Sequence, residues 1–157
     1  MAYHKSLKNL FADMEAKANS IMANDVFDKV VEVQSEMVEK HVYDAYDPTA
    51  YSRRGRNGGL ADPNNNVATF FSINGAMQML IENITTGSDE GTYIAGLVEY
   101  GHNNGYGKYQ YPYSSTQDPN FLLPRPFISE TIKHLQASGI IRQAFIEGFN
   151  KRGITTY

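Results

Sequence analysis

The sequence predicts an α+β fold, with a long N-terminal helix or helix pair, a small antiparallel sheet built on a β-hairpin, and a C-terminal helix packed on that sheet. Apolar residues recur at three- and four-residue steps over 3–43 and again after Pro126, which is the spacing of helices with one buried face. Between these patterns, two apolar runs flank Asn74-Gly75, a dipeptide typical of a hairpin turn. A chain of 157 residues can bury a core as one domain, 1–157.

The N-terminal pattern fits either one bent helix or two helices. Asn24 and Asp25 interrupt the apolar spacing, and both residue types can cap a helix or lie inside a longer one. The apolar stripe before them consists of Leu7, Leu10, Phe11, Met14, Ala18, Ile21 and Met22. Such spacing is typical of a helix that packs one face on the core of its own domain.

The predicted hairpin joins "VATFFSI" to "AMQMLIENI" through Asn74-Gly75, and a type I′ turn suits these two residues because both tolerate positive φ. Pairing across the turn places a mostly apolar set on the face that we expect to meet the helices: Ala68, Phe70, Ser72, Met77, Met79 and Ile81. The opposite face is mixed and includes Thr69, Phe71, Gln78 and Glu82. A sheet that is half exposed in this way suits contact between subunits.

Two segments, 44–66 and 102–120, are predicted to be extended loops or assembly arms because they are rich in Gly, Asn, Pro or Tyr. The first carries a cluster of basic residues, Arg53, Arg54 and Arg56, and its glycines would let the loop adapt to a partner. We interpret the cluster as a contact with an acidic protein surface or with DNA phosphates, or as a solvated loop without a partner.

The second segment has little charge and is rich in tyrosine. Its tyrosines are Tyr106, Tyr109, Tyr111 and Tyr113. Tyrosine offers a large contact area at a low cost in side-chain entropy, so these residues are predicted to bind neighbouring proteins. The segment would then order on assembly, with contact area offsetting the lost entropy.

The C-terminal third begins with "TYIAGLVEYG", which fits a short helix or an edge strand. Arg125 stands between two prolines, whose stiff backbone aims its side chain, and we expect it to hold the last helix through an ion pair, with Glu99 as a candidate partner. Pro126 suits the first turn of that helix, and Ser138-Gly139 predicts a kink or break within it.

Little catalytic chemistry can be read from the residues. The chain has no cysteine, and its net charge of −3 argues against a protein that coats nucleic acid. Two carboxylate–imidazole pairs, Glu99 with His102 and Glu130 with His134, would be the ligands of a small metal-dependent enzyme. The competing interpretation is a structural Glu99 and a surface ion pair at Glu130. We therefore predict no metal and no cofactor, and the absence of a long apolar run predicts no membrane span.

Three motifs together resemble a family of tailed bacteriophages, the head–tail joining or tail-completion proteins, also called minor tail or neck proteins. "YSRRGRNGGL" at 51–60 is similar to the family's Tyr-x-Arg-x-Gly-x-Leu loop. "YIAGLVEYG" at 93–101 resembles its Val-Glu-aromatic-Gly element, and "LPRPFI" at 123–128 resembles the Arg-Pro-Phe start of its last helix. The resemblance covers residues 1–152 in the order of the elements, although the segment before Arg125 is longer here.

The resemblance implies a structural subunit without catalytic residues that forms a homo-oligomeric ring, a hexamer or dodecamer, at the head–tail joint. The ring would connect the portal side to the tail, with other neck and tail proteins as neighbours and DNA passing through its lumen. Assembly in the host cytoplasm and a final place in the virion are implied as well. The alternative within the virion is a tail terminator or a minor capsid protein. A regulatory DNA-binding module is disfavoured by the near-neutral charge.

Overall fold

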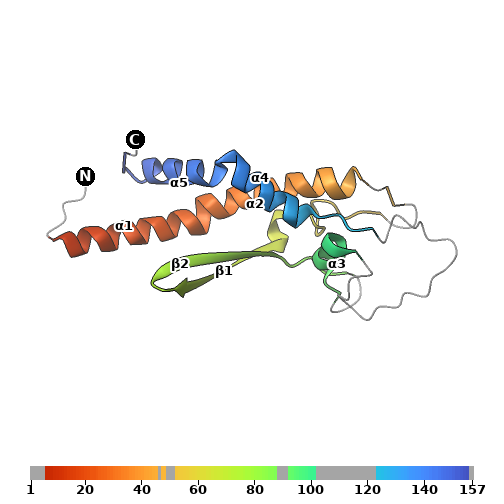
Figure 1. Ribbon diagram of the computed structural model, residues 1–157, viewed down its shortest axis with the longest axis horizontal. Coiled ribbons are helices and arrows are strands. Elements are labelled where there is room, and N and C mark those ends of the chain that lie inside the picture. Colours follow the sequence, from red (N-terminus) through yellow and green to blue (C-terminus); the bar gives the residue numbers. More distant parts are fainter. Residues whose placement is uncertain (1–5, 46, 49–51, 88–91, 102–122, 156–157) are drawn as a thin grey trace.

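The computed structural model describes residues 6–45, 47–48, 52–87, 92–101 and 123–155. A long helix runs the length of the molecule, with the C-terminal helices along one side of it and the hairpin along another (Figure 1). The elements are, in order, α1 (Leu7–Ile21), the π-helical η1 (Met22–Val26), α2 (Phe27–Val38), the π-helical η2 (Glu39–Tyr43), the 3₁₀ turn η3 (Pro63–Asn65), β1 (Asn66–Ile73), β2 (Ala76–Asn83), α3 (Ile94–Tyr100), α4 (Phe127–Ser138) and α5 (Ile140–Lys151).

The N-terminal segment is one continuous helix from α1 to η2, so of the two interpretations the single helix is confirmed. Where α1 gives way to η1, Met22 keeps helical backbone angles of φ −61° and ψ −45°. Ser6 caps the start, where its Oγ accepts a hydrogen bond from the Asn9 N–H at 3.3 Å. Asn24 lies inside the helix, and its Nδ2 donates to the Ser20 carbonyl at 2.7 Å. The π-helical turn at this point accommodates the polar residues that break the apolar spacing.

The hairpin has the predicted turn and register. Asn74 (φ 52°) and Gly75 (φ 80°) both adopt positive φ, as a type I′ turn requires. The strand partners include Ala68 with Ile81, Phe70 with Met79, and Ser72 with Met77. These pairs share one face, as expected, but Phe70 and Met77 near the tip are each 40 % exposed.

The C-terminal part consists of two helices, α4 and α5, which are separated at Gly139 in a left-handed conformation (φ 69°, ψ 7°). Both pack mainly on the long helix, α4 against α2 and α5 against α1 and η1. The α+β class is therefore confirmed, but the expected packing of the C-terminal helix on the sheet is wrong in this detail. The long helix offers α4 and α5 a broad apolar surface, whereas the two-stranded hairpin is narrow.

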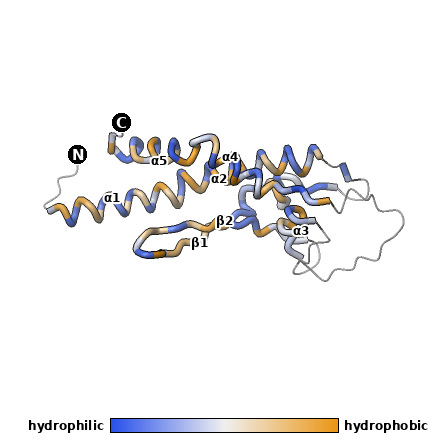
Figure 2. Tube along the Cα trace, viewed as in Figure 1, coloured by the Kyte–Doolittle hydropathy of each residue, from blue (hydrophilic) through white to orange (hydrophobic). Residues whose placement is uncertain are grey.

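The buried core divides into two clusters. The larger one lies where α2, α3, α4 and the loop before η3 meet, and Phe127 is fully buried in it. Its buried members are Val33, Met37, Val38, Val42, Leu60, Ala61, Ala95 and Phe127. The smaller cluster joins α1 to α5 through Ile21, Val26 and Ala144, with Met79 of β2 packed against it. Gly148 allows this close crossing, because a Cβ there would meet Ile21 Cγ2 at 2.6 Å. Hydrophobic residues also continue along α1 and the hairpin, beyond both clusters (Figure 2).

Candidate partner-binding surfaces

The arginine loop after η2 is tied to the body by two of its three arginines. The Arg53 guanidinium lies 5.1 Å from the ring centroid of Tyr43, which is a cation–π contact with the end of the long helix. Arg54 Nη2 donates to the Thr86 carbonyl at 2.5 Å, beyond the end of β2. Both side chains therefore bind to other parts of the same subunit.

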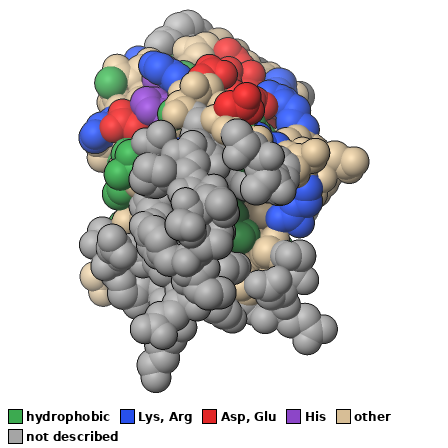
Figure 3. All heavy atoms as spheres, turned by 90° about the vertical axis from the view of Figure 1, so that its right-hand side faces the viewer, with side chains coloured by type: hydrophobic (Ala, Val, Ile, Leu, Met, Phe, Trp, Pro, Cys, Tyr) green, Lys and Arg blue, Asp and Glu red, His purple; other side chains and the backbone are tan. Residues whose placement is uncertain are grey.

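Arg56, like Arg54, is exposed to solvent. Its side chain is 63 % exposed, and its Nε lies 3.7 Å from Glu39 Oε1 in a surface ion pair. On the face of the molecule seen in Figure 3, the coloured acidic and basic side chains lie next to one another instead of forming a patch of one sign. The contact of Arg53, Arg54 and Arg56 with protein or DNA stays a prediction.

Hydrogen bonds fix the loop that leads into η3. Asp62 caps η3, and its carboxylate accepts the N–H of Gly58 at 2.6 Å and the N–H of Asn64 at 2.9 Å. These two bonds, the one from Gly58 first, hold the pKa of the Asp62 carboxyl below its ordinary value. At the base of the hairpin, Asn83 Nδ2 donates to the Leu60 carbonyl at 2.9 Å. Residues 58–65 are therefore held by hydrogen bonds and contain the 3₁₀ turn η3, while the role of 44–66 as an assembly arm stays a prediction. The network was not predicted from the sequence, although Asp-Pro-Asn-Asn is a typical turn sequence.

Glu99 connects the Val-Glu-Tyr-Gly segment to the helix that follows the Arg-Pro-Phe segment. It is 3 % exposed, and its carboxylate caps α4 by accepting the N–H groups of Ile128 (2.7 Å) and Ser129 (3.0 Å) as well as the Ser129 hydroxyl. The Arg125 N–H donates to the Val98 carbonyl at 2.7 Å and so fixes the entry into α4. Glu99 is thus a buried side chain that caps α4, and its predicted ion pair with Arg125 stays a prediction.

The partners of Glu99 and Glu130 are relevant to the alternative prediction, in which these residues bind a metal ion. Both Glu99 oxygens accept hydrogen bonds from α4, and Glu130 forms an ion pair with Lys133 on the surface. His102 lies outside the described residues. Among the residues that the structure describes, no group of three or more His, Asp or Glu side chains is arranged to hold a metal ion.

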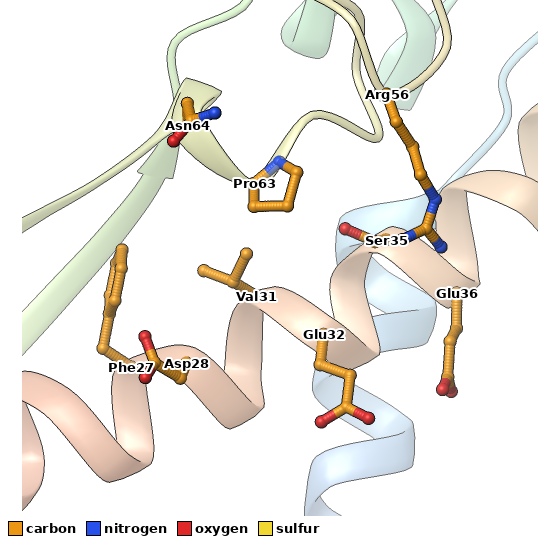
Figure 4. Close-up of a pocket in the computed structure, with 9 residues that line it drawn as sticks. All are labelled: Phe27, Asp28, Val31, Glu32, Ser35, Glu36, Arg56, Pro63 and Asn64. Atoms are coloured by element: carbon orange, nitrogen blue, oxygen red, sulfur yellow. The ribbon is translucent and has the colours of Figure 1, made fainter.

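A groove of about 540 Å³ lies between α2 and the segment that contains Pro63. Val31 and Pro63 face each other across it, while the carboxylates of Glu32 and Glu36 point away (Figure 4). The lining combines apolar side chains with polar ones such as Ser35, Arg56 and Asn64.

The hairpin and the start of α1 expose an unusual amount of apolar surface. On the sheet face opposite the predicted core face, the exposed fractions are 37 % for Val67, 41 % for Phe71, and 47 % each for Ile73 and Leu80. On α1, the corresponding stripe consists of Leu7 (72 %), Phe11 (65 %) and Met14 (41 %). We call these two surfaces the outer sheet face and the α1 stripe. Neither is covered by another described part of the chain.

The predicted tyrosine surface, with Tyr106, Tyr109, Tyr111 and Tyr113, and the whole predicted arm 102–120 lie outside the described residues. Their role in binding neighbours stays a prediction.

Comparison with known families identifies the group to which the chain is related. The model of one family, YomN, matches residues 6–151, which include every helix and strand described above. The chain belongs to the YomN family. YomN is the name of a phage-derived protein, so membership indicates a phage-associated protein. No curated protein and no solved structure matches this YomN-family chain. Across the described residues of this YomN-family member, no helix is long and apolar enough to cross a membrane.

Proposed function

We propose that this phage-associated chain is a structural virion protein, a ring subunit at the head–tail joint of a tailed phage that connects the portal side to the tail. The observation that carries the proposal is the apolar surface of the hairpin and α1. Side chains such as Phe71 and Phe11 need contact with other protein to leave water, and a structural assembly supplies such contact.

The place in the virion rests on the three-motif resemblance. The structure gives two of these motifs a joint role, because the segment 93–101 supplies the carboxylate that caps the helix following 123–126. This interaction supports the assignment of the chain to a protein type that has both motifs. The cap fixes where α4 begins, so the support comes from the arrangement of the elements within the subunit.

In this proposal the subunit acts by geometry and is not an enzyme. It would form a ring of six or twelve copies whose neighbours are other neck and tail proteins. It would assemble in the host cytoplasm and remain in the virion. The arginine loop, which presents the exposed Arg56, would face either a neighbouring protein or DNA passing through the lumen.

Electron microscopy of particles produced without this gene product tests the position. We expect DNA-filled heads and complete but separate tails, because both halves would form and only the joint would be missing. Complementation with the wild-type gene should restore joined particles, which controls for effects on neighbouring genes.

Other outcomes would change the conclusion in different ways. Tails of abnormal length would indicate a tail terminator, and a failure to form heads would indicate a minor capsid protein. Joined, infectious particles would show that the protein is not required at any of these positions.

A further inference from the structure

Two apolar surfaces lie on different elements of the subunit and differ in shape. The outer sheet face lies on a two-stranded sheet whose strands are eight residues long, about 26 Å at the usual rise of a strand. The α1 stripe is a narrow ridge from Leu7 to Met14 on the 15-residue helix α1, about 11 Å long at the usual rise of a helix. Because the sheet face is longer than the stripe, the whole ridge of one copy can lie along the sheet of another.

The sheet also has edges that native proteins normally protect. Among the described residues it has two strands, so β1 and β2 each have one edge without a strand partner. The hairpin segment 66–83 contains one charged residue, Glu82, and neither proline nor lysine, the residues that usually discourage pairing at an edge. A two-stranded hairpin of this kind is marginally stable alone in water, so its surroundings in the working protein must stabilise it.

We propose that the outer sheet face of each copy binds the α1 stripe of the next copy. This inference rests on the proposed ring, in which each subunit meets two neighbours. With exposed fractions near 40 % or more, the two surfaces together offer on the order of several hundred Å² of apolar area. Each partner contributes one of the two surfaces, so this total compares with the roughly 1,600 Å² that a stable interface buries on both partners together, and polar side chains around the two surfaces would supply the remainder.

A second copy fits these surfaces better than an unrelated partner does. Contact between two different patches of the same chain is head-to-tail, and such contacts form a ring where the rotation between neighbouring copies closes and an open filament where it does not. Symmetric pairing of two hairpins would leave the α1 stripe in water, whereas head-to-tail contact covers both surfaces with one interface.

Cross-linking tests the contact directly, because the chain has no cysteine of its own. Phe11→Cys and Leu80→Cys are introduced into separate chains with different affinity tags, which are purified, mixed and treated with a short thiol-reactive linker. We expect the 11-to-80 product to dominate over 11-to-11 and 80-to-80 products. Lys133→Cys, on the exposed side of α4, replaces Phe11→Cys in the matched control mixture and should give little product with Leu80→Cys.

Phe71→Asp provides an independent measurement by analytical ultracentrifugation. It should weaken self-association by roughly 30-fold, as the loss of a central aromatic anchor does, while circular dichroism shows a folded subunit. Dominant 80-to-80 cross-links, or a wild-type protein that stays monomeric at tens of micromolar and gives no more 11-to-80 product than the control, would overturn the proposal.

The two proposals can fail separately. Unjoined heads and tails in the deletion, together with no 11-to-80 product, would keep the neck position and remove this interface. A strong 11-to-80 product together with joined particles would keep the interface and remove the neck position.

Discussion

The two ends of the long helix lie in very different environments. In α2, six residues are buried, and Val33, Met37 and Val38 pack against α4 and the loop before η3. In α1, Ile21 alone is buried, and Leu7 and Phe11 on its outer half are mostly exposed. The long helix is therefore well covered by other elements at its α2 end and poorly covered at its α1 end.

The hairpin resembles α1 in this respect. Its inner face is tied to the body through Asn83 at the base and the half-buried Met79, whereas Phe71 and Leu80 on the outer face are exposed to water. The comparison teaches that the α2–α4 half stabilises the subunit and that the α1–hairpin half remains available for contacts with other chains. Substitutions should therefore affect folding in the first half and assembly in the second.

Phe127→Ala should have the largest effect on folding. Phe127 is fully buried in the larger cluster, so the substitution removes its apolar contacts and leaves a cavity that the surrounding helices cannot fill. We expect a loss of about 3–5 kcal/mol in the free energy of unfolding. Urea denaturation followed by circular dichroism measures it. A loss below about 1 kcal/mol would mean that this cluster is not the centre of the folded subunit.

Glu99→Ala should have the next largest effect. The substitution leaves the Ile128 and Ser129 N–H groups at the start of α4 without their carboxylate partner. We expect a loss of about 2–3 kcal/mol, because bonds to a charged acceptor are stronger than neutral ones. Denaturation measures the loss, and Glu32→Ala, on the exposed side of α2, is the matched control with an expected change within about 0.5 kcal/mol. Equal losses for the two variants would remove the capping role.

The sequence was sufficient to predict features that depend on local chemistry. Asn74-Gly75 predicts the turn and therefore the register of the hairpin, since few residues other than Asn and Gly adopt positive φ easily. Ser138-Gly139 similarly predicts the break between α4 and α5. A structural role for Glu99 was also predictable.

Features that depend on which surfaces meet could not be predicted from the sequence. The amphipathic pattern of α4 does not specify whether its apolar face covers the sheet or α2, because both surfaces are apolar. The acceptors of Arg54 and Asn83 are backbone carbonyls, which every residue carries, so no side-chain pattern identifies them. The outer sheet face was predicted as mixed, but Val67, Ile73 and Leu80 make it more apolar than its polar members suggested.

Asp25→Asn should have a smaller, pH-dependent effect. The carboxylate joins η1 to the end of α5 through Lys151 Nζ (3.0 Å) and Arg152 Nη1 (2.8 Å). The hydrogen bond from Lys151, the one from Arg152 and the charges of both hold the pKa of Asp25 below its ordinary value. A lowered pKa means that the carboxylate stabilises the fold at neutral pH and that this stabilisation disappears as pH falls through the folded-state pKa.

The measurement for Asp25→Asn is the difference in unfolding free energy from the wild type as a function of pH. We expect about 1 kcal/mol at most at pH 7, since Lys151 is largely exposed and solvent screens the pair. The difference should shrink below pH of about 4 and in high salt. Asp28→Asn, on the next turn of the helix, is the matched control. A difference that stays constant from pH 7 to pH 2 would show that the ion pair is not its cause.

Phe71→Ala should have the smallest effect on the isolated subunit, although it replaces the same type of residue, phenylalanine, as Phe127→Ala does. Phe71 is 41 % exposed on the outer sheet face, and its cross-strand neighbour is the polar Gln78, so its removal creates no closed cavity. We expect a loss below about 1 kcal/mol in urea denaturation of the monomer, the range of a cross-strand pair. Self-association measured on the same preparation should fall markedly. A large loss of subunit stability would instead place Phe71 in the folding core, and the division between a folding half and an assembly half would not hold.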